Sequence, residues 1–339
     1  MAKTLGEYYA KDYLKCNLTH NFFGSWQGLA YPSHVVQAIA FPIQILTFYV
    51  IIKNSPGNMN IIKHCLLINH FWCTILDITI CALSTPYIFI NHLSFLGVGI
   101  LSWFGIPFVY QLINFAFVAF FVGGSYVYLF ESRSRCLQEN IFRIKKNSHR
   151  LVYHSLLFLI CSTLFWIFFN VPKDLESAKL SLLSLDPCPP HEFFLPEVFV
   201  MTTDPDLIHF FIWYHIPLIM IHAVLHTLFH AICTVFYVFI SPSKITSPQT
   251  RQIQRQFFIG IIFQTAIPLV FLAVPIGYVV VAFFTGSLDQ AKLNLAVITA
   301  GLHGIGESFA VIIVHNSYRK AIWKMILGWK KKGPQESQK

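Results

Sequence analysis

Residues 256–284 read QFFIGIIFQTAIPLVFLAVPIGYVVVAFF, a run of 29 residues without a single charged side chain. A hydrocarbon core of about 30 Å is crossed by about 20 helical residues. Inside lipid no water satisfies the backbone N–H and C=O groups, so an unpaired apolar segment of this length has to be helical. This stretch therefore predicts a transmembrane helix.

Six further apolar stretches resemble it, and together they fill most of the chain. The seven predicted spans lie near residues 31–52, 65–90, 103–130, 150–170, 207–240, 256–284 and 292–315. An odd number of spans places the two termini on opposite sides of the membrane. We expect an all-α seven-helix membrane bundle over 31–315, an extracellular segment over 1–30, and a cytoplasmic tail over 316–339. This architecture favours a receptor.

The net charge of +9 is divided unevenly between the two sides. The loops after spans 1, 3 and 5 and the C-terminal tail hold 18 basic and 3 acidic residues, a net charge of +15. The other side holds 6 basic and 10 acidic residues, a net charge of −4. Because Lys and Arg concentrate on cytoplasmic loops, we expect an extracellular N-terminus and contact with anionic membrane lipid. Nucleic acid is not an expected partner.

Cysteine positions follow the same two sides. Cys16 and Cys188 lie in the expected extracellular segments, where an oxidising environment permits a disulfide; two free thiols are the alternative. Asn17 begins an Asn-Leu-Thr glycosylation sequon on that side. The cysteines within the spans are expected to be small buried hydrophobes.

Two segments outside the spans carry a local pattern. The loop over 171–206 is rich in proline, which favours an extended lid with little helix. In the tail, Ile322, Met325, Ile326 and Trp329 recur at helical spacing while basic residues occupy other positions. This pattern predicts an amphipathic helix at the inner membrane surface, with an unstructured tail as the alternative.

Acidic side chains inside spans are costly and need partners. Asp77 lies near the middle of span 2. It is interpreted either as part of an ion site or conformational switch, or as a hydrogen-bonded packing residue. Glu307 lies one helical turn after His303 in span 7, so the two share a face. This pair is interpreted either as a proton-exchanging switch or as a static hydrogen bond.

The inner end of span 3 carries Glu131, Arg133 and Arg135. An acid followed by arginines at this boundary would form a lock, and a released arginine would meet the unpaired carbonyl groups at the C-terminus of a partner's helix. The alternative is an ordinary basic flank. Prolines interrupt two of the later spans and predict kinks that allow pivoting, at Pro217 in span 5 and at Pro268 and Pro275 in span 6.

Span 5 holds His222, His226 and His230 on one helical face. Such a face suits a metal or haem in principle, but no second ligand cluster accompanies it, and we expect no metal and no cofactor. The outer halves of the spans predict an aromatic cavity for a small organic ligand. Its candidate residues are Tyr87, Phe108, Tyr110, Gln111, Asn114, Trp213, Tyr214 and Tyr278.

The chain resembles the nematode serpentine chemoreceptors of class H. The motifs that carry the resemblance run in order through most of the chain: Asn69-His70-Phe71-Trp72, Leu76-Asp77, Pro86-Tyr87, Phe130-Glu131-Ser132-Arg133, Pro187-Cys188-Pro189-Pro190, Gln264 with Pro268, His303-Gly304 and Tyr318-Arg319. The resemblance implies a chemosensory G-protein-coupled receptor in the plasma membrane of sensory cilia, with a heterotrimeric G protein and a small chemical cue as partners. Glu307 departs from the small hydroxyl residue usual in the family.

Two other classes remain as alternatives. A seven-helix transporter or ligand-gated channel would use Asp77 and Glu307 along an ion path, although the chain lacks the internal repeat of most transporter folds. A membrane metalloenzyme would use the histidines of span 5. We expect a receptor and not an enzyme.

Overall fold

The computed structural model describes residues 4–16, 21–57, 60–240, 259–260, 262–263 and 266–330. Among these described residues, seven helices are long and apolar enough to cross a membrane. They cover Trp26–Asn54, Ile62–Leu83, Phe108–Cys136, Asn147–Asn170, Pro205–Ile240, Ala266–Phe284 and Gln290–Val314. The prediction of a seven-helix bundle is confirmed.

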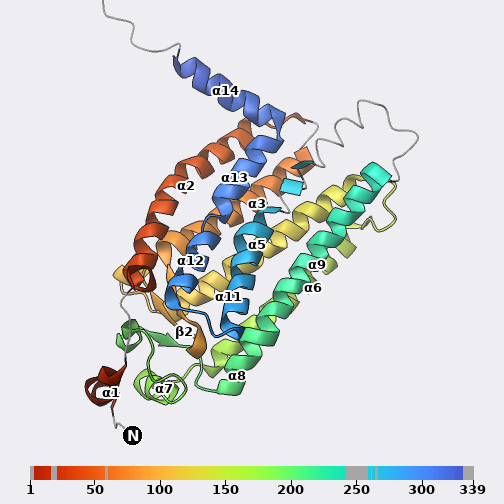
Figure 1. Cartoon of the computed structure of the whole chain (residues 1–339). Coiled ribbons are helices and arrows are strands. Elements are labelled where there is room, and N and C mark those ends of the chain that lie inside the picture. The colour runs from red at the N-terminus through yellow and green to blue at the C-terminus, as the bar shows by residue number, and fades with distance from the viewer. Residues whose placement is uncertain are drawn as a thin grey trace, which may run out of the picture.

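The spans are built from the labelled elements of Figure 1. The first four are α2 (Trp26–Asn54), α3 (Asn60–Ile78) with the π turn Thr79–Leu83, α5 (Phe108–Cys136), and α6 (Asn147–Ser162) with a 3₁₀ segment. The fifth comprises α8 (Pro205–Phe210), a π turn, α9 (Ile216–Val235) and a second π turn, and the sixth ends in α11 (Val274–Phe284). The seventh is divided into α12 (Gln290–Ala300) and α13 (His303–Val314).

Polar residues before several helices mark where they begin. The Ser25 hydroxyl accepts a hydrogen bond from the backbone N–H of Gly28 at the start of α2. Carboxylates cap three others in the same way: Asp174 before α7 (Leu175–Leu182), Asp204 before α8 and Asp289 before α12. Each oxygen satisfies a donor that the first helical turn leaves unpaired.

Two of the three prolines expected to kink helices lie in the first turn of the helix that follows a π turn. Pro217 is the second residue of α9, after the π turn Phe211–His215, and Pro275 is the second residue of α11, after the π turn Leu269–Ala273. Pro268 stands just before the second of these turns. Proline has no N–H and its ring clashes with the carbonyl four residues earlier, so a widened turn at that point accommodates it.

A small folded cap covers the end of the bundle nearest the N-terminus (Figure 1). It contains α1 (Leu5–Lys11), α7 and an antiparallel sheet of β1 (Pro86–Phe89), β2 (Ser94–Gly97) and β3 (Phe199–Val200), in that order. The loop over 171–206 thus contains a helix and a strand, which corrects the expectation of an extended lid. Its apolar residues Ala178, Leu182 and Phe193 are buried in a core shared with β1 and α2, and this burial stabilises the helix.

Span 2 ends earlier than expected. The helix stops at Leu83, Thr85 adopts a positive φ of 39°, and Pro86 begins β1. The residue before a proline is disfavoured in helical geometry, so the chain leaves the helix here. Tyr87 therefore lies on a strand of the cap and not on the second span.

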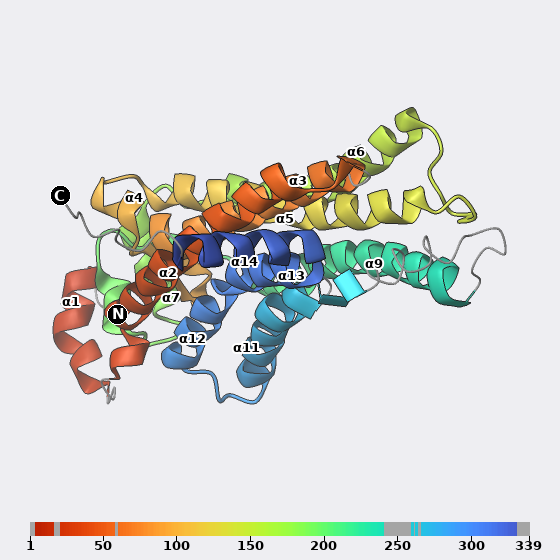
Figure 2. The same ribbon diagram turned by 90° about the horizontal axis from the view of Figure 1, so that it is seen from above.

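The opposite end of the bundle carries α14 (Asn316–Lys330), which runs across the helix ends (Figures 1 and 2). The Tyr318 hydroxyl lies 2.7 Å from Ser55 Oγ, and the Tyr318 ring belongs to a buried cluster with Val50 and Leu129. Trp323, Ile326 and Leu327 are exposed on the same helix. This is the segment for which the sequence predicts an amphipathic helix.

Candidate functional site

Asp77 lies at the centre of a buried polar network between α2, α3 and α13. Its Oδ2 accepts a hydrogen bond from Gln44 Nε2 at 2.8 Å, and its Oδ1 accepts one from the backbone N–H of Gly304 at 3.1 Å. A Cβ at position 304 would lie 2.2 Å from Asp77 Oδ2. The carboxylate approaches α13 this closely because residue 304 has no side chain.

His70 and Glu307 form a second buried contact between α3 and α13. His70 Nε2 lies 3.0 Å from the carbonyl oxygen of Gln44, which only accepts, so this nitrogen carries a hydrogen. His70 Nδ1 lies 2.5 Å from Glu307 Oε2. One further proton is therefore held between Nδ1 and the carboxyl group. Both side chains are at most 1% exposed.

The partner of Glu307 is thus His70, and not His303 as the shared helical face suggests. His303 Nε2 instead lies 3.0 Å from the Tyr126 hydroxyl on α5. Successive turns of α13 face different neighbours, so each polar side chain pairs across the bundle instead of along its own helix. His70 lies seven residues before Asp77 on the same face of α3, and this spacing was the signal in the sequence for its place in the network.

At the C-terminal end of the bundle, Glu131 pairs with Arg150 of α6. Arg150 Nε donates to Glu131 Oε2 at 2.6 Å, and its guanidinium lies 4.4 Å from the centre of the Tyr128 ring. This pair joins α5 to α6, whereas the sequence suggests a lock between Glu131 and the arginines that follow it, Arg133 and Arg135. Arg133 is two residues from Glu131 on the helix and does not face it, and Arg135 is bonded to another residue.

Arg133 points into the bundle, with only 4% of the residue exposed. Its Nε, Nη1 and Nη2 have no hydrogen-bond partner among the residues that the structure describes. The guanidinium is close to α13, since a Cβ on neighbouring Gly260 would lie 2.8 Å from Val314 Cγ1 and 3.7 Å from Arg133 Nη1. Arg135 faces the other way and donates to Asn147 Oδ1 at 2.8 Å. A buried guanidinium without a partner is costly and is satisfied by any acceptor that reaches it.

The eight residues expected to form an outer ligand cavity do not converge. Phe108, Gln111 and Tyr87 are buried, and the Tyr87 hydroxyl donates to the carbonyl oxygen of Gly24 at 2.6 Å. Trp213 packs its ring against Phe283 and Phe284. The remaining four are exposed on the helix surfaces: Tyr110, Asn114, Tyr214 and Tyr278.

The histidines of the fifth span are partly engaged by a tyrosine. The Tyr153 hydroxyl lies 2.8 Å from His226 Nδ1 and 3.2 Å from His230 Nε2. Within the described parts of the chain, no group of three or more His, Cys, Asp and Glu side chains is arranged to hold a metal ion. This contact is of the kind expected for interior histidines that bond to a neighbouring helix.

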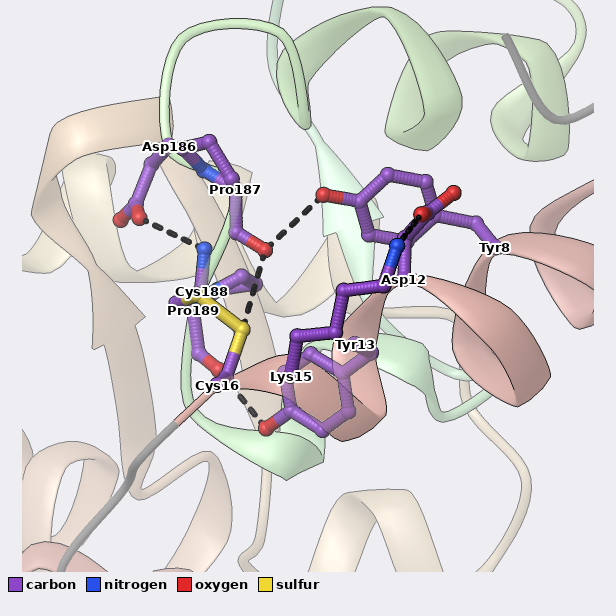
Figure 3. Close-up of a disulfide and its surroundings, with 9 residues drawn as sticks. All are labelled: Tyr8, Asp12, Tyr13, Lys15, Cys16, Asp186, Pro187, Cys188 and Pro189. Atoms are coloured by element: carbon purple, nitrogen blue, oxygen red, sulfur yellow. Dashed lines mark hydrogen bonds and ion pairs between the residues drawn. A yellow bond between two sulfur atoms is a disulfide. The ribbon is translucent and has the colours of Figure 1, made fainter.

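The N-terminal segment is fastened to the cap by a disulfide between Cys16 and Cys188, whose Cα atoms are 5.7 Å apart (Figure 3). Two tyrosines support it: the Tyr8 hydroxyl donates to the carbonyl oxygen of Pro187, and the Tyr13 hydroxyl to that of Pro189 (Figure 3). Burial raises the pKa of Tyr13 to about 12, so it remains a donor. Asn17 of the sequon and Gln264 of the sixth span lie outside the described residues.

Comparison with known proteins covers nearly the whole chain. The family model described as "Serpentine type 7TM GPCR chemoreceptor Srh" matches residues 24–328. "Serpentine receptor class H-72" of Caenorhabditis elegans is 30% identical over 320 residues, which are 93% of this chain and 91% of that protein. "Serpentine receptor class r-10" of Caenorhabditis briggsae is 31% identical over 94 residues, 28% of each chain.

Proposed function

Since this chain belongs to the Srh family of serpentine seven-transmembrane chemoreceptors, we propose that it binds a small organic cue on its N-terminal side and activates a heterotrimeric G protein on the other. It is a multi-pass membrane protein of a receptor family, not an enzyme family. The proposal places the N-terminus outside the cell, in the plasma membrane of the cilium of a chemosensory neuron. The net charge of +15 on the C-terminal side supports this orientation.

The observation that carries the proposal is the state of Arg133. Its buried guanidinium has no partner in the described part of the chain, while the acid beside it, Glu131, is engaged by Arg150. A receptor needs a group at its inner end that a partner reaches in one arrangement of the helices and not in another. Arg133 would supply it, by donating to the unpaired carbonyl groups at the C-terminal end of a G-protein helix. Arg135, bonded to Asn147, would help to hold the adjoining loop.

The network around Asp77 would act as the switch. It joins α2, α3 and α13 through Gln44, His70, Gly304 and Glu307, and His303 with Tyr126 adds α5. A ligand shifts the balance between two helix arrangements only if it binds them with different affinity. Rearranging these contacts would link a ligand near the cap to the position of Arg133. Asp77 and Glu307 both make hydrogen bonds within the bundle, which does not favour an ion path along them.

The test is nucleotide exchange by defined G-protein heterotrimers with the full-length receptor in lipid nanodiscs, across a panel of small organic compounds. We expect at least one compound to accelerate exchange. Arg133→Gln should remove the acceleration by tenfold or more while leaving ligand binding intact, and Arg143→Gln should keep most of it. Failure of every compound with every heterotrimer would count against the proposal. A conductance that persists without G protein would favour a channel.

A further inference from the structure

A cavity of about 400 Å³ lies at the N-terminal side of the bundle, where three separate segments meet. These are the segment that leads from β2 into α5 (Gly97, Ser102 and residues 105–109), the start of the long loop (171–175) and the stretch that leads into β3 (196–199). Of the eight residues expected to bind ligand, Phe108 lines it. The cavity is therefore distinct from the interhelical space that the sequence suggests.

The walls of the cavity are mainly apolar, with side chains from Ile106, Phe108, Val109, Leu175 and Phe199. One uncharged polar side chain, Ser102, also lines it. The Ser102 oxygen already accepts a hydrogen bond from Gln111 Nε2 at 3.0 Å, so its hydrogen is left to donate. Gln111 is 1% exposed and holds this hydroxyl in place.

Two exposed charged residues also line the cavity, Lys173 and Glu197. They have opposite signs, so the cavity carries no net charge from its side chains. A charged ligand would lose hydration without finding a net counter-charge. A neutral molecule that accepts one hydrogen bond from Ser102 fits this chemistry best.

The position of the cavity relative to the bilayer suggests the route of entry. Three of the five residues just before α5 expose large apolar side chains: Trp103 is 67% exposed, Phe104 79% and Ile106 39%. The transmembrane helix itself begins at Phe108, so this turn stands at the membrane boundary, where aromatic side chains favour the interface. A ligand dissolved in lipid would meet the cavity beside this turn.

Direct entry along the bundle axis is covered by the cap. The disulfide Cys16–Cys188 fastens the N-terminal segment over the loop. Glu192 accepts a hydrogen bond from the backbone N–H of Trp26 at the start of α2, and Gln290 Nε2 of α12 donates to the carbonyl oxygen of Ile88 in β1 at 3.1 Å. These contacts tie the cap to α2 and α12. The side cavity remains beside them.

From these observations we infer that the cavity binds a small neutral organic molecule with one hydrogen-bond acceptor, such as an aliphatic ketone or ester, which enters from the lipid boundary. The inference rests on the proposed receptor function, because it names the ligand class and the site. Ser102 is the specificity-determining donor. Ile106, Phe108, Val109 and Phe199 form the apolar enclosure.

Photolabelling of the full chain in nanodiscs tests this site without a G protein. The probe is an aliphatic ketone that carries a diazirine, competed by the same ketone without the diazirine, with labelled peptides identified by mass spectrometry. We expect competable labelling within residues 102–109, 171–175 and 196–199. Competable labelling confined to peptides of α9 or α11 would overturn the inference.

Matched variants sharpen the result. Val109→Trp fills the cavity and should reduce competable labelling at least tenfold, whereas Val224→Trp, on the exposed surface of α9, should leave it unchanged. Ser102→Ala removes only the hydroxyl group and should weaken the affinity for the ketone roughly three- to tenfold, which is the contribution of one hydrogen bond. Labelling by a hydrocarbon that carries a diazirine should be unaffected. Equal labelling of Val109→Trp and the wild type would contradict the site.

The outcomes also separate this inference from the receptor proposal. Competable labelling at the cavity without any G-protein activation contradicts the proposed function and leaves the site standing. A ligand response that survives Val109→Trp at full strength contradicts the site and leaves the function standing.

Discussion

His70 Nδ1 on α3 lies 2.5 Å from Glu307 Oε2 on α13, and neither side chain meets solvent. Because His70 Nε2 donates to the carbonyl oxygen of Gln44, the imidazole is fixed between two helices by both nitrogens. The contact holds one proton in either form, imidazolium with carboxylate or imidazole with carboxylic acid. It joins the second and seventh spans in the middle of the bundle.

Removing one member of this pair should be costly. Glu307→Ala leaves His70 buried without its partner, a change that typically costs about 3–5 kcal/mol when the pair is charged. Glu307→Gln keeps a hydrogen bond and should cost less. Thermal unfolding of the receptor in nanodiscs, with Glu139→Gln as an exposed control, measures the difference. An unchanged midpoint for Glu307→Ala would show that the pair does not stabilise the bundle.

Gly304 is expected to be intolerant of even a methyl group. Its Cβ would stand 2.2 Å from Asp77 Oδ2 and 2.8 Å from Asp77 Cγ, so Gly304→Ala must separate α13 from α3 and should cost roughly 1–3 kcal/mol. The same change at Gly277 in α11 meets nothing within 4 Å and should be neutral or stabilise by up to about 1 kcal/mol. The thermal unfolding midpoint should therefore fall in Gly304→Ala, whereas in Gly277→Ala it should stay unchanged or rise.

The disulfide of the cap can be tested by counting free thiols. Six cysteines are free in the structure and the chain has eight, so maleimide should label six thiols in the denatured, unreduced protein and eight after reduction. Cys188→Ser should loosen the N-terminal segment and lower the stability of the cap by about 2–5 kcal/mol, the usual cost of removing a disulfide from a small secreted domain. Faster proteolysis at residues 4–16, with the bundle intact, is the expected result. Eight labelled thiols before reduction would exclude the bond.

Lys179 should make the cap sensitive to pH. It is 3% exposed, its Nζ donates to the carbonyl oxygen of Leu195 at 2.5 Å, and burial lowers its pKa from 10.5 to about 8. The folded state therefore binds this proton more weakly than the unfolded state. Stability should be lowest below about pH 8 and increase as the pH rises toward 10.5, by about 1.4 kcal/mol per unit of pKa lowering.

The matched control for Lys179 is Lys173, which is exposed in the same loop. Lys179→Met removes the buried charge and should abolish this part of the pH dependence, whereas Lys173→Met should retain it. Unfolding midpoints between pH 7 and pH 10 measure the slope. Identical slopes in the two variants would assign the pH dependence to other groups.

The spans were predictable because a bilayer imposes length and apolarity on each helix independently of its neighbours. The end of span 2 was not predictable, because the residues of β1, from Pro86 to Phe89, continue the apolar character of the helix before them. Hydropathy alone does not separate a helix from a buried strand. The fold of the loop over 171–206 depends on burial of Leu182 and Phe193 against the cap, which is a tertiary effect.

The sequence identified several residues of the candidate site, but it did not identify which residues they pair with. Asp77 and Glu307 stand out because acids in spans are rare, but their partners Gln44 and His70 come from other parts of the chain. Sequence spacing reports neighbours along one helix and says little about the helix opposite. Glu131 and Arg133 show that the opposite also occurs: they are close in the sequence, yet their side chains lie on different sides of α5.

The π turns before Pro217 and Pro275 have a consequence for the direction of side chains. An α-helix advances about 100° per residue, so one extra residue in a turn rotates everything after it by about that angle relative to an unbroken helix. In α9, the face that brings His226 and His230 to Tyr153 is therefore set by the register at Phe211–His215. Converting that turn to a regular α-turn would rotate the whole helix face that follows it, so a change of register at either π turn would alter which residues the fifth or sixth span presents to its neighbours.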